Sequence, residues 1–87
     1  MEKKADVALA RAIQARMAER QMNQTQLEME TGVSRSTLAW IIKDGIGHLE
    51  TFGRVCKALG IQPAQLLARA DRLREELRDE AAAGTAT

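Results

Sequence analysis

The amino-acid sequence predicts an all-α protein, a compact bundle of about five short helices with an extended C-terminal helix. Three observations favour this class. Aromatic residues, which prefer strands, make up only 2% of the chain, and the other apolar residues are mainly alanine, leucine, isoleucine, methionine and valine. Apolar residues recur with a helical period, and short polar or glycine-containing breaks separate the periodic segments. A chain of 87 residues forms one small core.

The first two helices are predicted from an apolar stripe and a cap. A first helix is expected from Asp6 to Arg20. Along it, an apolar residue recurs every four positions: Leu9, Ile13 and Met17. Asn23 is a favourable N-cap, because its side-chain oxygen can accept hydrogen bonds from the exposed amides of the following turn. A second, short helix is therefore expected from Gln24 to Thr31.

A third helix follows after a tight turn. Gly32 can adopt the positive φ that ends the second helix, and Ser34 is another favourable N-cap. The third helix is expected from Arg35 to about Lys43. Its buried face is formed by apolar residues at positions i, i+3 and i+4: Leu38, Ile41 and Ile42. A loop is expected next, over residues 44–47, because its two glycines favour a turn.

The last two helices are predicted from an amphipathic pattern and a proline. A fourth helix is expected from Leu49 to Gly60, with the clearest apolar face in the chain: Leu49, Phe52, Val55, Cys56 and Leu59. Pro63 is suited to the first position of a fifth helix. That helix is expected to be long, because residues 69–80 contain neither glycine nor proline. Residues 81–87 hold no large apolar side chain and are expected to fray.

The second and third helices have the pattern of a helix-turn-helix, in which the first helix braces the second. The residues that carry it are Gln24-Thr25-Gln26-Leu27, Gly32-Val33-Ser34-Arg35-Ser36-Thr37-Leu38 and Ile41. On these residues, with flanks that extend the match from about Leu9 to Leu67, the chain resembles the phage repressor and Cro-like regulators, often called XRE-like. The resemblance implies a lambda-repressor-like helix-turn-helix domain over residues 1–69 and a C-terminal helical extension over residues 70–87.

Two residues of the bracing helix depart from the family pattern. Glu28 stands where the family usually has a small residue, and Thr31 replaces the usual apolar residue before Gly32. The loop between the third and fourth helices is also slightly shorter than is common. We expect Glu28 to tilt outward and Met29 to share the packing between the two helices.

The resemblance implies sequence-specific binding to double-stranded DNA, with the helix 35–43 in the major groove. We expect a transcription regulator, a repressor, that reads a palindromic operator. The residues expected to contact bases are Arg35, Ser36, Ala39 and Trp40. The residues expected to contact the DNA backbone are Gln24, Thr25, Ser34, Thr37, Lys43 and His48.

The helical period supports this assignment independently. The side of the third helix opposite its leucine and isoleucines carries small, polar, aromatic and basic residues: Ser36, Ala39, Trp40 and Lys43. Arg35 has a guanidinium fork that fits O6 and N7 of guanine. Trp40 has three interpretations, which are partial burial in the core, contact with another protein, and contact with DNA. His48 is either a helix-start cap, a surface residue or a phosphate ligand.

A second apolar stripe runs along the last helix with the spacing of a short coiled coil: Leu66, Ala70, Leu73 and Leu77. The stripe either packs back on its own domain or pairs with a second chain. Leu73 and Leu77 lie beyond the usual end of the family, so we expect a homodimer. A dimer would present two recognition helices to half-sites about 34 Å apart.

The residue inventory argues against other functions. Cys56 and His48 are the single cysteine and histidine, so they provide neither a disulfide nor a four-ligand zinc site. There is no arrangement of a nucleophile with a base, and we expect no enzymatic activity, metal or cofactor. No apolar run approaches the roughly 20 residues of a membrane span, and the first residues lack the apolar segment of a secretory signal. We therefore expect a cytoplasmic protein that does not bind membranes.

Two alternatives remain open. The net charge is only +1, and two glutamates lie on the bracing helix. These features are compatible with a protein-interaction module, such as an antitoxin or anti-repressor, that uses the same fold to bind a protein partner. A purely structural helical oligomer explains less, because it assigns no role to the caps and the tight turn.

Overall fold

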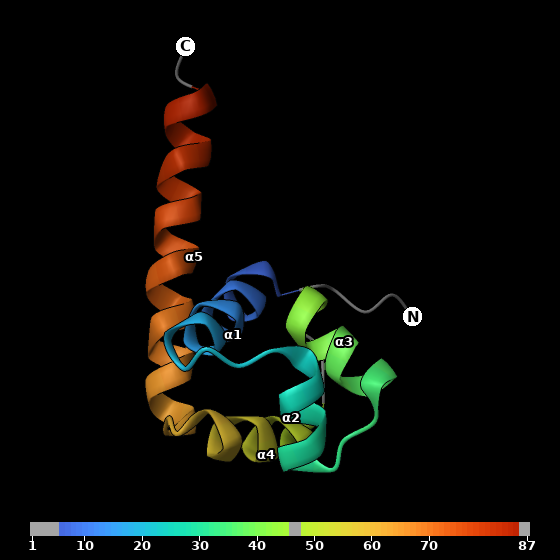
Figure 1. The fold of residues 1–87 in the computed structure, drawn as a ribbon. Helices are drawn as coiled ribbons and strands as arrows, with labels where there is room; N and C mark the ends of the chain where they lie inside the picture. Colours follow the sequence, from blue (N-terminus) through green and yellow to red (C-terminus); the bar gives the residue numbers. More distant parts are fainter. Residues whose placement is uncertain (1–5, 46–47, 86–87) are drawn as a thin grey trace.

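Helices account for most of the chain that this computed structural model describes, residues 6–45 and 48–85, which confirms the all-α class (Figure 1). Their bounds are α1 Val7–Glu19, α2 Gln24–Thr31, α3 Arg35–Asp44, α4 Leu49–Leu59 and α5 Pro63–Thr85. α1 packs against α5 and α3, and α2 packs against α3 and α4. The C-terminal half of α5 rises well above the rest of the molecule in the figure.

The helix boundaries lie close to those expected from the sequence. Asp6 accepts a hydrogen bond from the amide of Leu9 at 3.1 Å and begins α1. Left-handed glycines end α2, α3 and α4: Gly32, Gly45 and Gly60. Asp44, which we expected in a loop, is the last residue of α3, and its carbonyl accepts a hydrogen bond from the amide of Asp6 at 2.6 Å. Ile46 and Gly47, the rest of the expected loop, lie outside the described residues.

The largest side chains of the core are at most 1% exposed: Ile13, Leu27, Leu38, Ile41, Val55, Cys56, Leu59 and Leu66. α1 contributes buried alanines at positions 8, 10 and 12, whose small side chains let the neighbouring helices approach closely. Leu49, which the pattern of α4 assigned to the core, is 85% exposed. It lies in the first turn of α4, beyond the edge of the core, so only the later apolar residues of that helix are buried.

The predicted seam of α5 is partly intramolecular. Leu66 and Ala70 are 0% and 1% exposed and belong to the core of their own chain. Leu73 packs against the same core and is partly buried, as is Leu77. Leu66 and Ala70 are therefore covered by α5's own neighbours, and the expectation that they face a second chain is corrected. α5 also continues to Thr85, so residues 81–85 are helical where fraying was expected.

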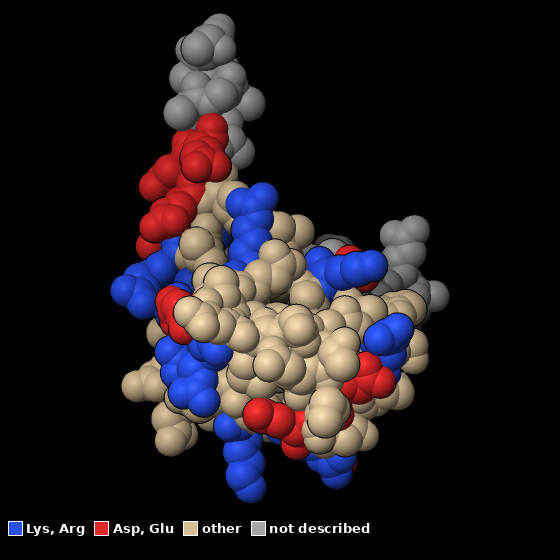
Figure 2. Space-filling view, viewed as in Figure 1, with Lys and Arg blue, Asp and Glu red and all other residues tan. Residues whose placement is uncertain are grey.

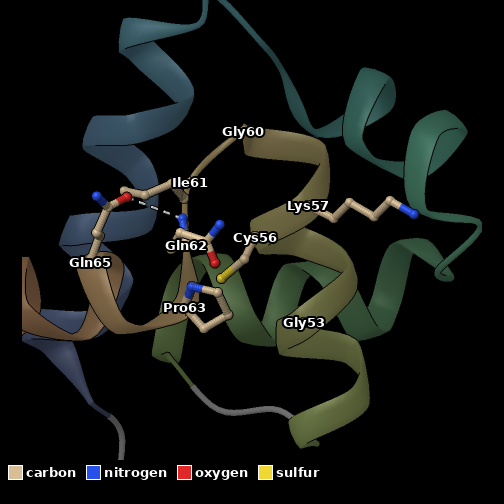
Figure 3. Close-up of a pocket in the computed structure, with 8 residues that line it drawn as sticks. All are labelled: Gly53, Cys56, Lys57, Gly60, Ile61, Gln62, Pro63 and Gln65. Carbon is tan, nitrogen blue, oxygen red and sulfur yellow. Dashed lines mark hydrogen bonds between the residues drawn. The ribbon is translucent and has the colours of Figure 1, made fainter.

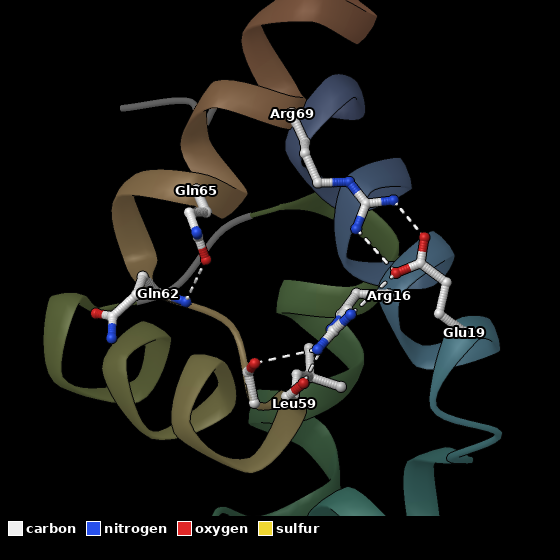
Figure 4. A network of polar contacts seen from close by, with 7 residues as sticks. Arg16, Glu19, Leu59, Gln62, Gln65 and Arg69 are labelled. Carbon is white, nitrogen blue, oxygen red and sulfur yellow. Dashed lines mark hydrogen bonds and ion pairs between the residues drawn. The ribbon is translucent and has the colours of Figure 1, made fainter.

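A group of charged side chains joins α1 to the end of α4 and to α5 (Figure 4). Arg16 donates to the carbonyls of Leu59 and Gly60 at 2.9 and 3.0 Å, which satisfies the open C-terminal end of α4. Glu19 accepts from Arg69 at 2.6 and 3.0 Å and from Arg16 at 3.2 Å. The two hydrogen bonds from Arg69, and then the one from Arg16, lower the pKa of Glu19 from 4.5 to about 2. The group thus holds three helices together.

A second ion pair anchors α5 at its middle. Arg74 donates to both carboxylate oxygens of Asp6 at 2.9 Å, and Asp6 is also the N-cap of α1.

In the described part of the chain, no helix has both the length and the apolar character needed to cross a bilayer.

We expect Gly45→Ala to destabilise the fold more than Gly32→Ala does. Both glycines have a positive φ, which costs an alanine about 1 to 2 kcal/mol. A Cβ atom at Gly45 would also fall against the carbonyl oxygen of Asp6, whereas a Cβ atom at Gly32 meets open space. The clash adds about 1 to 3 kcal/mol at Gly45. Urea unfolding of the two variants measures the difference, and equal losses would contradict the close contact between α1 and α3.

We expect the stabilisation by Glu19 to disappear in acid. The folded-state pKa lies below the unfolded value, so the contribution is fully present above pH 4.5 and is lost as the pH falls towards about 2. Thermal melts of wild type and Glu19→Gln should differ at neutral pH and converge at the acid end of this range. Glu76→Gln is the control, because Glu76 is an exposed carboxylate on α5. The difference between its melting temperature and that of the wild type should not shrink in this way as the pH falls. A difference in melting temperature between wild type and Glu19→Gln that does not depend on pH would contradict this role of the Glu19 carboxylate.

Candidate nucleic-acid interface

The turn between α2 and α3 is closed by backbone and side-chain hydrogen bonds. Asn23 and Gln26 form a capping box at the start of α2, each side chain bonding the other's backbone amide at 2.8 Å. At its end, the Thr31 hydroxyl donates to the carbonyl of Leu27 at 2.6 Å and accepts from the amide of Val33 at 3.2 Å. Thr31, a departure from the family pattern, therefore satisfies polar groups of the turn.

Hydroxyl groups gather at the N-terminal end of α3. Ser34 caps the helix by accepting from the amide of Thr37 at 3.4 Å, and its hydroxyl donates to the Thr37 hydroxyl at 2.9 Å. The hydroxyl of Ser36 lies 3.4 Å from that of Ser34. This end of the helix also carries unpaired amides and the positive end of the helix dipole. The three hydroxyls are thus grouped where an anion such as a phosphate is favoured.

The start of α2 is tied to the start of α3. Gln24 donates from its amide nitrogen to the backbone carbonyl of Arg35 at 3.1 Å. Thr25, beside it, is exposed. Both residues were predicted to contact the DNA backbone, and the structure places them in the first turn of α2, next to the first turn of α3.

The outer face of α3, formed by Arg35, Ser36, Ala39, Trp40 and Lys43, is turned away from the core. On the opposite side, Leu38 and Ile41 are 0% and 1% exposed. On the outer face, the side chain of Arg35 is 71% exposed and Trp40 is 50% exposed. Ser36 and Lys43 are exposed, and Ala39 is partly buried. The four predicted base-contacting residues therefore lie on one accessible surface.

Lys43 and His48 flank the end of α3. Lys43 lies in the last turn of the helix, where a cation interacts favourably with the helix dipole. His48 is the N-cap residue of α4, but its side chain makes no capping hydrogen bond. His48 is therefore an exposed residue at the start of a helix, as one of the interpretations expected, and it caps α4 without its side chain.

Glu28 was expected to tilt outward, but the sequence did not predict which residue it contacts. Its carboxylate Oε2 lies 3.5 Å from Nε of Arg35, so the bracing helix forms an ion pair with the first residue of α3. The Glu28 side chain is 34% exposed, as expected for a residue that tilts outward. Met29 does not share the packing, because it is 81% exposed. A helical period cannot reveal a contact between two helices, which explains why the pair was missed.

The charge around this site is balanced. From α2 to the end of α4 the sequence contains equal numbers of basic and acidic residues. Figure 2 shows acidic side chains gathered on the raised part of α5, and both basic and acidic side chains distributed around the body. Nonspecific attraction to phosphates is weak for such a surface, so selective contacts must contribute a larger share of any affinity.

A hollow lies between α4 and α5. Cys56 and Lys57 are the titratable residues that line it, and Figure 3 shows the lysine side chain extending away from the sulfur. Burial raises the pKa of the Cys56 thiol to about 11, so it stays protonated and unreactive at neutral pH. In the described ranges, no three histidine, cysteine or acidic side chains are grouped as metal ligands.

Comparison with known proteins agrees with this geometry. The sequence model of the Cro/C1-type helix-turn-helix DNA-binding domain matches residues 12–71. The chain is similar to the crystal structure of the clp gene regulator ClgR from C. glutamicum, with a TM-score of 0.68, 25% sequence identity, and coverage of 80% of this chain and 92% of that one. No curated protein matches it in sequence. Because the family match spans most of the chain, the protein belongs to the Cro/C1-type helix-turn-helix DNA-binding family.

Proposed function

We propose that the protein is a transcriptional repressor that reads a palindromic DNA operator through the major groove. The observation that carries the proposal is the accessible outer face of α3, since Arg35 is 71% exposed there while Leu38 and Ile41 are buried beneath it. A helix held on one side and accessible on the other can enter a groove about 12 Å wide. Gene regulation is also the stated role of ClgR, the similar protein.

In this proposal, the residues divide into base readers and phosphate contacts. Arg35 donates to O6 and N7 of a guanine, and Ser36 bonds a neighbouring base edge. Ala39 and Trp40 provide apolar contact area against base and sugar edges. Contacts to the DNA backbone come from both ends of α3 and from the start of α2: Gln24, Thr25, Ser34, Thr37, Lys43 and His48. These contacts set the register of α3 on the duplex without reading sequence.

The proposal includes a homodimer, because one short helix contacts few base pairs and a twofold pair reads an inverted repeat. Leu66 and Ala70 belong to the core of their own chain, so in this proposal the contact between chains uses the raised part of α5. Leu77 is the remaining large apolar residue of the predicted seam that has no place among the core residues or the side chains packed against them.

We expect Arg35→Ala and Lys43→Ala to weaken DNA binding in different ways. Selection of duplexes from a random pool identifies the bound sequence first. Arg35→Ala should then lose about 1 to 3 kcal/mol of preference at a guanine position. Lys43→Ala should weaken all sequences by a similar factor and reduce the slope of log K against log salt by about 1. Fluorescence anisotropy at several salt concentrations measures both effects.

Arg72→Ala is the matched control, because it removes the same charge from an exposed position on α5, a helix that lies outside the proposed contacts with DNA. It should leave both sequence preference and salt slope unchanged. Equal, unselective losses in Arg35→Ala and Lys43→Ala would contradict their separate roles. If no duplex is enriched and a protein partner is retained instead, the protein is an interaction module of the antitoxin or anti-repressor kind.

We expect Leu77→Lys to convert the dimer to a monomer. A charged side chain at this position would have to be buried without a partner when two α5 helices pair. Glu76→Lys introduces the same side chain at the adjacent, exposed position and should leave the mass unchanged. Sedimentation equilibrium measures the mass of both variants. A wild-type monomer, or a Leu77→Lys protein that remains dimeric, would show that α5 does not mediate association.

A further inference from the structure

Two residues one turn apart on α2 hold Arg35 at two points. Gln24 donates to its backbone carbonyl at 3.1 Å, and the carboxylate of Glu28 lies 3.5 Å from its Nε atom. Residues four apart on a helix share one face, so both contacts come from the same side of α2. One contact positions the main chain at the start of α3, and the other restricts the direction of the long side chain.

The side of the guanidinium that Glu28 occupies determines what remains for a ligand. A guanidinium has five N–H donors in a fixed plane, and the ion pair is made at Nε. The two terminal nitrogens form the opposite edge, and 71% of the side chain is exposed. Two parallel donors on one edge are the arrangement that binds O6 and N7 of guanine. A guanidinium that rotated freely would offer this edge only part of the time.

We propose that Glu28 is a specificity-determining residue that positions Arg35 for a guanine and penalises other sequences. The inference rests on the proposed function, in which Arg35 reads a base. With guanine present, the carboxylate, the guanidinium and the base acceptors form one continuous chain of opposite charges and hydrogen bonds. With another base, Glu28 brings a negative charge near the duplex without that compensation, and like charges in a contact disfavour the wrong partner.

The test replaces the carboxylate with an uncharged amide of the same shape, Glu28→Gln. The probe is the duplex selected with the wild-type protein, together with copies in which the guanine read by Arg35 is changed and an unrelated duplex. We expect the preference for guanine to fall about three- to tenfold, as part of the value of a bidentate contact. Binding to the unrelated duplex should tighten by about two- to fivefold, because a nearby negative charge is removed.

Glu30→Gln is the matched control. It removes the same charge from the same helix, but Glu30 lines a surface hollow with Arg54 and Lys57 of α4 and does not pair with Arg35. It should leave the preference for guanine at the wild-type value. Thermal melts of both variants provide a second readout. If Glu28→Gln lowers the melting temperature and weakens all duplexes equally, its role is only structural and the proposal is overturned.

A double variant separates this proposal from the assignment of Arg35. In an Arg35→Ala background, Glu28→Gln should no longer change base preference, because the residue that it positions is absent. If Arg35→Ala itself leaves the preference intact, Arg35 does not read a base, and the proposed function fails in that part together with this inference. If Arg35→Ala abolishes the preference while Glu28→Gln and Glu30→Gln behave alike, only the inference is overturned.

Discussion

The burial of Leu38 and Ile41 beneath α3 is the constraint on which the rest of the interface depends. These two side chains attach the helix to the core along one side, and the fixed rotation between successive residues then turns Ser36, Trp40 and Lys43 away from it. The same packing places the capped N-terminal end of the helix at the surface, where its amides and hydroxyls are grouped.

The position of α3 is set by its neighbours as much as by its own sequence. At its N-terminal end, Gln24 bonds the carbonyl of Arg35, and the Thr31 hydroxyl closes the turn. At its C-terminal end, the carbonyl of Asp44 meets the amide of Asp6, which ties α3 to the start of α1. Both ends are therefore held by short polar contacts. A helix of ten residues fixed at both ends and along one side is suited to presenting side chains in a defined geometry.

The apolar stripe of α5 begins in the core and continues beyond it. The first turns of α5 supply Leu66 and Ala70 to the core, and Arg69 and Arg74 bind carboxylates at the two ends of α1. These contacts fix the direction in which the remaining turns leave the body of the molecule (Figure 1). The raised part of α5 is rich in acidic side chains, which disfavour contact with the phosphates of DNA (Figure 2).

Local signals in the sequence were sufficient to predict the helices, whereas tertiary contacts decided which side chains pair. The caps at Asn23 and Ser34 and the glycine at position 32 act within a few residues, so the sequence alone located the helix-turn-helix and the outer face of α3. The exposure of Leu49 and the burial of Leu66 depend on where other helices end. The helical period of apolar residues carries no information about that. The ion pair between Glu28 and Arg35 likewise required the crossing of two helices to be known, since a contact across space has no signature along the chain.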